Sequence, residues 1–302
     1  MSHNPVMLSE VLSTLSPRNN ETYIDATFGA GGYTGAILDK AACTVVGCDR
    51  DPEAKERAEN FKKKYRDRFC FIEGRFGDLT SLVPEKNYDG IIFDLGVSSP
   101  QIDNPERGFS FKADGPLDMR MEKKGLSAAD VINTFEAKEI ARILWVYGEE
   151  RCSHAIAKAI VEKRPFYATG QFAELVRSIV GFERKGFDPA TRTFQALRLY
   201  VNDELGQLER GLEASEKLLK GGGRLIVVSF HSLEDRIVKM FLRKRSGGFP
   251  HASRHLPDVP RQKPLFEMKD RKALLPTEEE IKVNPRARSA KLRWAIRTEG
   301  EV

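Results

Sequence analysis

The sequence predicts an α/β fold in which a doubly wound parallel sheet is interrupted by an inserted, all-helical domain. Short β-branched segments alternate with amphipathic segments through the first hundred residues, only helical patterns occur over 105–215, and strand character returns at 224–230. Alternation of this kind is typical of a parallel sheet covered by helices on both faces. We therefore predict a discontinuous sheet domain at 1–104 and 216–302, with the helical domain at 105–215 between its two parts.

The first βαβ unit carries a cluster of glycines. Residues 22–25 form a short strand pattern, 28–33 read Phe-Gly-Ala-Gly-Gly-Tyr, and 34–38 have helical apolar spacing. A second strand pattern over 44–48 ends at Asp49. Glycine lets the backbone come close to a ligand, and an acid roughly 20 residues further on, at the next strand end, suits the hydroxyls of a ribose. The unit therefore indicates an adenosine-binding turn.

This turn leaves several cofactors open. Enzymes that bind NAD favour glycine or alanine at the third position after the second glycine of the motif, where this chain has Thr34. That difference disfavours NAD. A glycine-rich turn can also be a simple tight connection, and an acid such as Asp49 can be an ordinary helix cap. The choice depends on residues further along the chain.

The remaining elements follow from apolar periodicity and turn signals. Residues 89–95 form a continuous apolar run of the kind that is buried on both faces of a parallel sheet. Residues 246–264, rich in Gly, Pro, Ser and His, are expected to form a mobile surface loop. We predict further strands at 69–72, 224–230, 265–269 and 290–297, and helices at 53–65, 137–147, 150–163, 171–181 and 190–219, with a capping box at 127–130 and another helix starting at Ser232.

Chemistry is expected at the carboxyl ends of the first, second and fourth strands, because open α/β sheets bind ligands there. The glycine turn contains no Walker lysine, which disfavours phosphoryl transfer. Pro100 stands where a hydrolase elbow would have its second glycine. An adenosine pocket without metal ligands or an activated nucleophile suits group transfer from a cofactor that is already electrophilic, such as S-adenosylmethionine.

The loop after the fourth strand offers groups that can hold an acceptor. Ser98, Ser99 and Pro100 place hydroxyls and backbone carbonyls in the loop that follows Asp94. Such acceptors can hold the hydrogens of an exocyclic amino group and favour a pyramidal nitrogen. We regard these three residues as candidate catalytic residues, with an ordinary Ser-Ser-Pro turn as the alternative.

Composition restricts the class of protein. The chain has 302 residues, of which 40% are hydrophobic, so it can bury a substantial core. It has neither an apolar run of ~18 residues nor a basic start followed by an apolar stretch, which predicts a cytoplasmic protein without membrane segments. Its 4 cysteines lack the spacing of a disulfide framework or a zinc site, so no metal is expected.

Charge is unevenly distributed along the chain. The whole sequence has a formal net charge of +5, but residues 236–302 contain 17 basic and 8 acidic side chains. A basic end on an otherwise slightly acidic protein fits a polyanionic partner, because each cation that neutralises a phosphate releases counterions. A merely solvated basic surface is the alternative.

Several long motifs occur in a fixed order along the chain. With them the sequence resembles the MraW (RsmH) family of bacterial small-subunit ribosomal RNA cytosine-N4 methyltransferases over nearly its full length. The matching segments include 25–29 (Asp-Ala-Thr-Phe-Gly), 49–52 (Asp-Arg-Asp-Pro), 93–101 (Phe-Asp-Leu-Gly-Val-Ser-Ser-Pro-Gln), 107–111 (Arg-Gly-Phe-Ser-Phe), 115–121 (Gly-Pro-Leu-Asp-Met-Arg-Met), 147–151 (Tyr-Gly-Glu-Glu-Arg), 189–198 (Pro-Ala-Thr-Arg-Thr-Phe-Gln-Ala-Leu-Arg), 229–236 (Ser-Phe-His-Ser-Leu-Glu-Asp-Arg) and 284–293 (Asn-Pro-Arg-Ala-Arg-Ser-Ala-Lys-Leu-Arg).

The resemblance implies a Rossmann-like class I methyltransferase fold that uses S-adenosylmethionine. It implies cofactor contacts at Gly31, Gly32, Tyr33, Asp49, Phe76, Asp94 and Gln101. Tyr33 departs from the family pattern, in which histidine commonly follows the paired glycines. A backbone contact at this position would survive the exchange, whereas a contact through the imidazole would not.

The resemblance also implies the substrate. It is one cytidine of 16S ribosomal RNA, in the decoding region near the P site, methylated on N4 within the small ribosomal subunit. Residues in matching motifs that are candidates for holding RNA are Arg107, Asp118, Arg120, Arg192, His231, Arg286 and Arg288. Each has a structural alternative as an ion pair or loop anchor.

Other functions and one assembly question stay open at this point. A DNA amino-methyltransferase would use the same cofactor and loop chemistry, and a noncatalytic RNA-binding assembly factor could keep the fold as a scaffold. A homodimer is one candidate oligomeric state.

Overall fold

The computed structural model describes residues 5–85, 87–181, 188–247 and 263–299. The chain divides into two compact units, one formed by Met1–Gly96 with Leu205–Val302 and the other by Val97–Glu204. None of the helices in these described ranges is long and apolar enough to cross a membrane. The loop expected at 246–264 has its central part, 248–262, outside the described residues.

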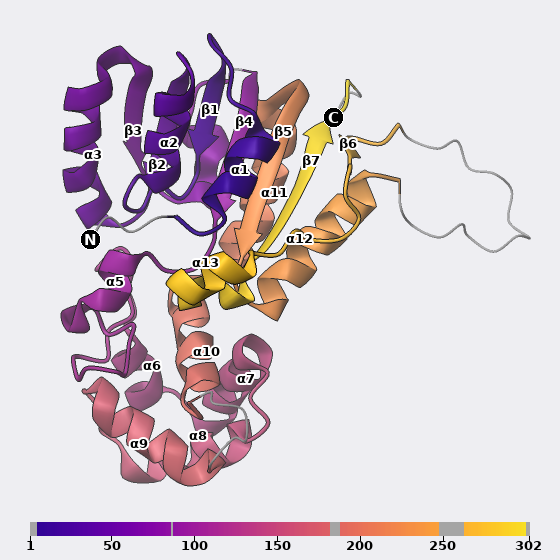
Figure 1. Cartoon of the computed structure of the whole chain (residues 1–302). Coiled ribbons are helices and arrows are strands. Elements are labelled where there is room, and N and C mark those ends of the chain that lie inside the picture. The colour runs from indigo at the N-terminus through magenta and orange to yellow at the C-terminus, as the bar shows by residue number, and fades with distance from the viewer. Residues whose placement is uncertain (1–4, 86, 182–187, 248–262, 300–302) are drawn as a thin grey trace, which may run out of the picture. The chain divides into compact units, whose positions relative to one another are not determined.

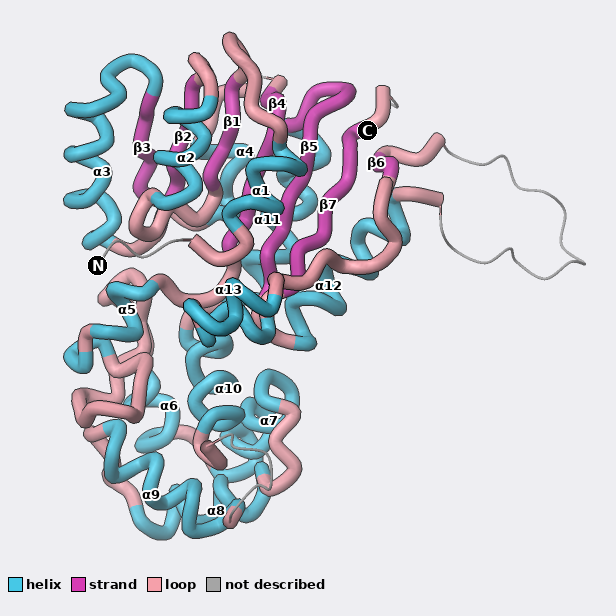
Figure 2. The backbone as a smooth tube through the Cα atoms, viewed as in Figure 1, coloured by secondary structure: helices cyan, strands magenta, loops and turns pink. Residues whose placement is uncertain are grey.

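The first unit is built on a seven-stranded sheet with the order β3-β2-β1-β4-β5-β7-β6 (Figures 1 and 2). Pairing is parallel from β3 through β5 and antiparallel at β7 and β6. This topology confirms the predicted α/β fold class. The strands are β1 (Thr22–Asp25), β2 (Thr44–Asp49), β3 (Phe69–Glu73), β4 (Tyr88–Asp94), β5 (Leu219–Ser229), β6 (Phe266–Glu267) and β7 (Lys291–Arg297).

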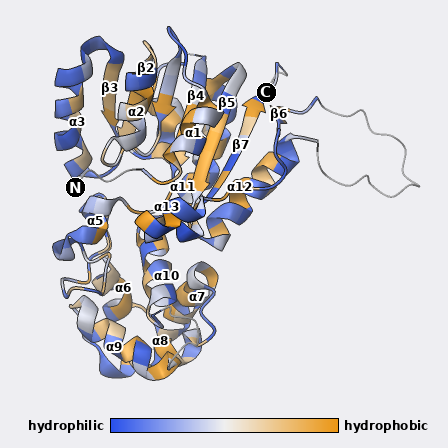
Figure 3. Cartoon of the chain, viewed as in Figure 1, coloured by the Kyte–Doolittle hydropathy of each residue, from blue (hydrophilic) through white to orange (hydrophobic). Residues whose placement is uncertain are grey.

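Successive residues of the central strands enter cores on opposite faces of the sheet. On β4, Ile91 and Phe93 belong to one cluster while Ile92 belongs to another. Because neighbouring strand residues point to opposite faces, a strand that is buried on both sides must be apolar throughout. Figure 3 shows hydrophobic colour along β5 and a largely hydrophilic α3.

Helices cover both faces of this sheet. One core cluster includes side chains of α4, α11 and α12, and the other includes side chains of α1, α2 and α3. The helices of this unit are α1 (Leu8–Leu15), α2 (Gly32–Lys40), α3 (Pro52–Tyr65), α4 (Leu79–Leu82), α11 (Glu204–Leu218), α12 (Ser232–Arg245) and α13 (Glu278–Val283). Of these, α1, α4 and α13 were not predicted from the sequence.

The second unit has a core of its own, made by helices. These helices are α5 (Ser99–Asp103), α6 (Ala128–Thr134), α7 (Ala137–Gly148), α8 (Ser153–Lys163), α9 (Thr169–Val180) and α10 (Thr191–Val201). Their apolar side chains, such as Ile140, Leu144, Ile156 and Phe172, are fully buried in one cluster. Helical periodicity therefore located this unit well, although α8 begins at Ser153 rather than at residue 150.

The single helix predicted over 190–219 is wrong. The helix ends at Val201, and α11 starts after Asp203, whose φ of 49° lies in the left-handed region. Asn202 accounts for the break, because its amide donates to the carbonyl of Met119 and accepts from the amide of Met121, at 2.7 and 2.9 Å. These two bonds join the Asn202 side chain to a loop about eighty positions earlier in the sequence.

The break also explains why the helical unit ends earlier in the sequence than predicted. We expected the insertion to span 105–215, whereas the helical unit spans Val97–Glu204. The helix α11 belongs with the sheet, since Leu208 and Leu212 are buried in the same cluster as strand residues. Periodicity shows that a segment is helical but not which core receives its apolar face.

The packing of α11 makes a stability prediction. Leu212→Ala removes a fully buried side chain from the sheet core and should lower the free energy of unfolding by about 2–5 kcal/mol. Glu213→Ala, at the exposed neighbouring position of the same helix, should change it by no more than about 0.5 kcal/mol. Urea denaturation of both variants checks this, and equal effects would contradict the packing of α11 on the sheet.

Candidate cofactor site at the carboxyl ends of the strands

The glycine turn joins β1 to α2, as predicted. Gly31 has a φ of 80°, and a Cβ atom there would lie 2.4 Å from the Phe61 ring. At Gly32 a Cβ atom would lie 2.3 Å from Cγ of Pro5. Both glycines are therefore required by the close approach of the chain's own side chains, and Gly31 also by its backbone conformation.

Asp49, at the end of β2, is held directly against this turn. Its carboxylate accepts hydrogen bonds from the amides of Gly29 at 2.6 Å and Asp51 at 2.9 Å. Burial of the carboxyl group raises the pKa of Asp49, and the two amide donors act in the opposite direction. The structure thus brings together the two features that the sequence pattern linked, the glycine cluster and the acid at the next strand end.

Asp25 ends β1 and is almost completely buried. Its carboxylate accepts from Thr34 Oγ1 at 2.7 Å and from the amide of Thr27 at 3.3 Å. Burial raises the pKa of Asp25 to about 6, although both hydrogen bonds favour the charged form. Thr34, which in the sequence only disfavoured NAD, has its own role here because its buried hydroxyl supports this carboxylate.

Asp94 ends β4, on the other side of β1. Its amide donates to Thr27 Oγ1 at 2.6 Å, so one threonine is hydrogen-bonded to both strand-end acids. Within the described part of the chain, Oδ1 of Asp94 is a buried atom with no hydrogen-bond partner. Burial raises the pKa of Asp94 well above its usual range, and the negative charges of Asp25 and Glu234 add to the rise.

These three acids lie on adjacent strands, since β1 pairs with both β2 and β4. Buried polar atoms in native proteins nearly always have hydrogen-bond partners, so Oδ1 of Asp94 is available for a hydrogen bond that the described residues do not supply. The arrangement offers acceptors for hydroxyl or amino groups along one edge of the sheet. In the described ranges, no group of three or more His, Cys, Asp or Glu side chains is arranged to hold a metal ion.

Tyr33 lies beside these acids but is turned into the protein. Its side chain is 3% exposed, and its hydroxyl donates to the backbone carbonyl of Val6. Burial raises the pKa of Tyr33 well above its usual value, and the nearby Asp94 and Asp25 carboxylates raise it further. The hydroxyl of Tyr33 is therefore occupied by the N-terminal segment.

Phe76 follows β3 in a short 3-10 turn (Phe76–Asp78). It is half-buried, and its ring meets Phe93 edge-on with 5.6 Å between ring centroids. Gly211 of α11 leaves room for it, because a Cβ atom there would lie 2.9 Å from the ring. The apolar ring is thus fixed at the carboxyl end of β3.

The candidate catalytic residues fall at the start of the helical unit. Gln101 is buried in α5, and its side-chain oxygen accepts from the amide of Ser98 at 2.9 Å. Ser98 and Gln101 form a capping box at the start of α5, and Ser98 Oγ is buried there. Ser99 and Pro100 form the first turn of α5, directly after the chain leaves the sheet unit.

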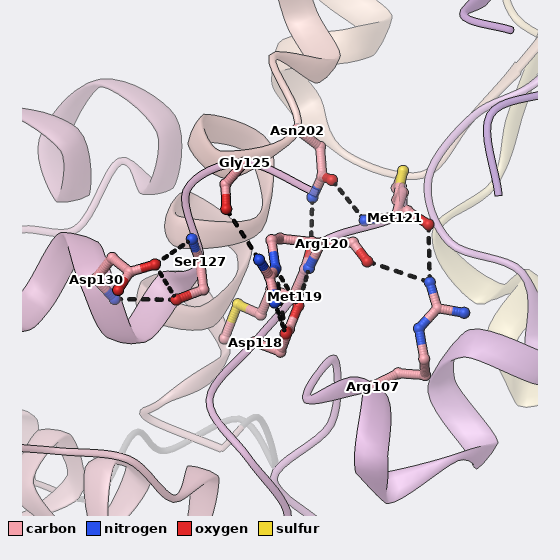
Figure 4. Close-up of polar contacts among 9 residues, drawn as sticks. All are labelled: Arg107, Asp118, Met119, Arg120, Met121, Gly125, Ser127, Asp130 and Asn202. Carbon is pink, nitrogen blue, oxygen red and sulfur yellow. Dashed lines mark hydrogen bonds and ion pairs between the residues drawn. The ribbon is translucent and has the colours of Figure 1, made fainter. Parts of the chain in front are cut away.

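Three of the substrate candidates form one network in the helical unit (Figure 4). The buried Arg107 donates to the backbone carbonyls of Arg120 at 3.1 Å and Met121 at 2.9 Å. Asp118 and Arg120 form an ion pair at 2.6 Å, and Arg120 also donates to the Gly125 carbonyl. In this structure, the contacts of these three residues are therefore those of an ion pair and a loop anchor, the alternative to holding RNA that the sequence left open.

The same view shows the predicted capping box at the start of α6. Ser127 Oγ accepts from the Asp130 amide at 3.1 Å, and the Asp130 carboxylate accepts from the Ser127 amide at 2.9 Å. This reciprocal pair satisfies two amides that a helix start leaves without intrahelical partners. The prediction of a capping box at 127–130 is confirmed.

The remaining substrate candidates differ in exposure. His231 caps α12, where its Nδ1 accepts from the Glu234 amide at 3.4 Å and its own amide donates to the Glu234 carboxylate. Arg192 is exposed at the start of α10, and Arg286 and Arg288 are exposed in the turn Pro285–Ser289. The structure places Arg192 in the helical unit and the other three in the sheet unit.

The family comparison is decisive. The model of the MraW methylase family matches residues 1–298. The chain therefore belongs to the MraW methylase family. This confirms the resemblance that the sequence motifs indicated.

Two relatives that match this chain over nearly their full length have the same name. "Ribosomal RNA small subunit methyltransferase H" of Paramagnetospirillum magneticum is 56% identical to it over 98% of this chain and 96% of that protein. The protein of the same name from Rhodospirillum rubrum is 51% identical over 98% of this chain and 94% of its own length. A putative methyltransferase from Streptococcus mutans, solved in complex with SAH, covers 98% of this chain and 99% of that one with a TM-score of 0.45 at 12% identity.

The buried Asp25 makes a prediction about pH. Its folded-state pKa of about 6 lies above the usual 3.8, so folding favours the protonated form and stability is lost as the pH rises from about 4 to 6. Asp25→Asn removes this titration. Relative to the variant, the wild-type free energy of unfolding should fall by about 2–3 kcal/mol over that interval. Urea denaturation at a series of pH values checks this, and parallel curves for the two proteins would contradict it.

Proposed function

We propose that this protein transfers a methyl group from S-adenosylmethionine to the N4 amino group of a cytidine in 16S ribosomal RNA of the small subunit, in the decoding region near the P site. The observation that carries the proposal is the full-length match to relatives named ribosomal RNA small subunit methyltransferase H, at 51–56% identity. A bacterial ribosomal substrate would place the enzyme in the cytoplasm.

The residues at the strand ends suit this cofactor. In the proposal, Asp49 accepts hydrogen bonds from the ribose hydroxyls, beside backbone groups of Gly31, Gly32 and Tyr33. Phe76 packs against the adenine ring, and Asp94 and Gln101 make polar contacts. The unpaired buried Oδ1 of Asp94 supports this assignment, because a ligand that donates a hydrogen bond there would satisfy it. When bound, S-adenosylmethionine supplies a methyl group that its positively charged sulfonium already activates.

The segment after β4 is proposed to hold the acceptor. Ser98 and Ser99 offer hydroxyl and carbonyl oxygens, and Pro100 fixes the backbone at the start of α5. Hydrogen bonds from the amino group to these oxygens would keep the nitrogen lone pair out of conjugation with the base and stabilise the positive charge that develops on nitrogen. The short distance in sequence between these residues and Asp94, which is proposed to contact the cofactor, supports this role.

The arginines divide into two proposed roles. Exposed Arg192, Arg286 and Arg288 are proposed to contact phosphates, which fits the basic composition of the C-terminal region. Arg107 and the Asp118–Arg120 pair are proposed to act through the loop that they anchor rather than through direct contact with RNA. Similarly, His231 is proposed to support the turn between β5 and α12.

A methylation assay tests the proposed function. The protein is incubated with isotopically labelled S-adenosylmethionine and, separately, with small ribosomal subunits lacking the modification, naked 16S ribosomal RNA, or duplex DNA. We expect labelled N4-methylcytidine in the ribosomal RNA, mapped by nuclease digestion and mass spectrometry to one site.

Other outcomes identify the alternatives. Methylation of DNA alone would indicate a DNA amino-methyltransferase. Binding to subunits without methyl transfer would indicate a noncatalytic assembly factor, and binding of NAD in place of the methyl donor would indicate an oxidoreductase.

The proposed ribose contact predicts the effect of Asp49→Ala. Loss of hydrogen bonds to a charged carboxylate should weaken the affinity for S-adenosylmethionine by about tenfold to a hundredfold. Asp67→Ala removes the same charge at an exposed position before β3, at the opposite end of the parallel strands, and serves as the control. Isothermal titration calorimetry measures both, and near-native affinity of Asp49→Ala would exclude the ribose assignment.

A further inference from the structure

We propose that Arg57 is a positioning residue of the cofactor site, which holds the glycine turn and keeps Asp49 ready to accept hydrogen bonds. The proposal rests on the proposed binding of the cofactor at Asp49 and adds a residue to which neither the sequence pattern nor the family resemblance assigned a role.

Arg57 completes a chain of contacts through Gly29. Its Nε donates to the carbonyl oxygen of Gly29 at 2.9 Å, while the amide of Gly29 donates to Asp49 Oδ2 at 2.6 Å. Gly29 has a φ of 53°, in the left-handed region that suits glycine. Both polar backbone groups of Gly29 are thus bound by charged side chains, one from α3 and one from β2.

The start of α3 is tied to the same carboxylate. The Asp51 side chain caps the helix by accepting from the Glu53 amide at 3.0 Å, and the Asp51 amide donates to Asp49 at 2.9 Å. Glu53, Arg57 and Phe61 follow at intervals of four, which places them on one face of the helix. Arg57 Nη1 lies 3.9 Å from the Glu53 carboxylate.

Phe61 shows that this face of α3 rests on the turn. Its ring meets Phe28 edge-on with 5.2 Å between centroids, and it fills the space that a Cβ atom of Gly31 would need. Arg57 lies one helical turn before it. Along this face of α3, Arg57 therefore lies between Glu53, whose amide is capped by Asp51, and Phe61, which contacts the turn.

The positive charge of Arg57 also acts on the pKa of Asp49, in the direction opposite to burial. Burial and the neighbouring Asp51 carboxylate raise the pKa of Asp49, whereas Arg57 lowers it. Asp49 in turn raises the pKa values of Asp25 on β1 and Cys48 on β2. Loss of the Arg57 charge would therefore let the Asp49 carboxylate hold a proton to higher pH.

A contribution to folding stability alone is a poor explanation for an arginine at position 57. Its Nη2 is buried and has no hydrogen-bond partner within the described part of the chain. A buried donor that lacks a partner destabilises a protein, so an arginine with such an atom is a weak structural element. Its well-formed contact is the one to Gly29, in the turn that the proposed cofactor would touch.

The test compares Arg57→Met, Arg57→Lys and a control, Lys62→Met, which removes one positive charge from the same helix at an exposed ion pair with Glu59. Binding of S-adenosylhomocysteine is measured by calorimetry with the full-length chain at a series of pH values from about pH 4 to about pH 8, so that protonation is followed from the usual carboxylate range upward. Thermal unfolding of each variant is recorded alongside.

We expect Arg57→Met to bind about tenfold more weakly near neutral pH, and the pH below which affinity is lost to rise by about one unit, the low end of the effect of a neighbouring cation. Arg57→Lys should keep that pH midpoint, because the charge remains, but lose part of the affinity, because the hydrogen bond to Gly29 is disturbed. Lys62→Met should behave as the wild type.

The opposite results are equally clear. Wild-type affinity and an unshifted midpoint in Arg57→Met would overturn the role of Arg57 while leaving the proposed function intact. If Arg57→Met does not fold, a pH midpoint in Arg57→Lys shifted as far as loss of the charge predicts would overturn the electrostatic role. Failure of the wild-type chain itself to bind S-adenosylhomocysteine would contradict the proposed function, and this inference with it.

Discussion

The hydrogen bond from the Gly29 amide to the Asp49 carboxylate is the contact on which the rest of the site depends. It joins the turn after β1 to the end of β2, and the same carboxylate holds the Asp51 amide that precedes α3. Because parallel pairing already aligns the ends of β1 and β2, this one side chain reaches both the turn and the start of α3. The backbone groups proposed to meet the cofactor are therefore positioned by an acid that is itself proposed to bind it.

The sequence predicted those parts of the fold that repeat along the chain. Apolar runs such as 89–95 identified buried strands because both of their faces enter a core. Asn202 shows where such reasoning fails, since its helix-ending role comes from Met119 and Met121, some eighty positions away in sequence. Thr34 was interpreted only as a mismatch to another motif, and Arg57 carried no signal, because their partners are fixed by packing across elements.

The candidate site shows the same division between pattern and packing. Glycines followed by an acid at the next strand end predicted the approach of Gly29 to Asp49, since the chemistry and the topology both appear in the spacing. Arg107, Asp118 and Arg120 also occur in motifs that match the family, and from the sequence they were candidates for contact with RNA. In the structure, however, their charged groups bind the protein's own backbone and each other. A loop that must hold its shape constrains arginines as strongly as a contact with phosphate does, and the sequence alone does not separate the two causes.

The three buried acids at the strand ends couple the stability of the sheet unit to ligand binding. Burial raises the pKa values of Asp25, Asp49 and Asp94, so charged carboxylates here destabilise the fold near neutral pH. Proteins keep such groups chiefly at functional sites, where strain in the free state is relieved on binding. A ligand that donates hydrogen bonds or brings positive charge would favour the ionised forms and lower these pKa values. Binding and stability are then coupled, because the ligand stabilises the folded state that alone presents the three acids together.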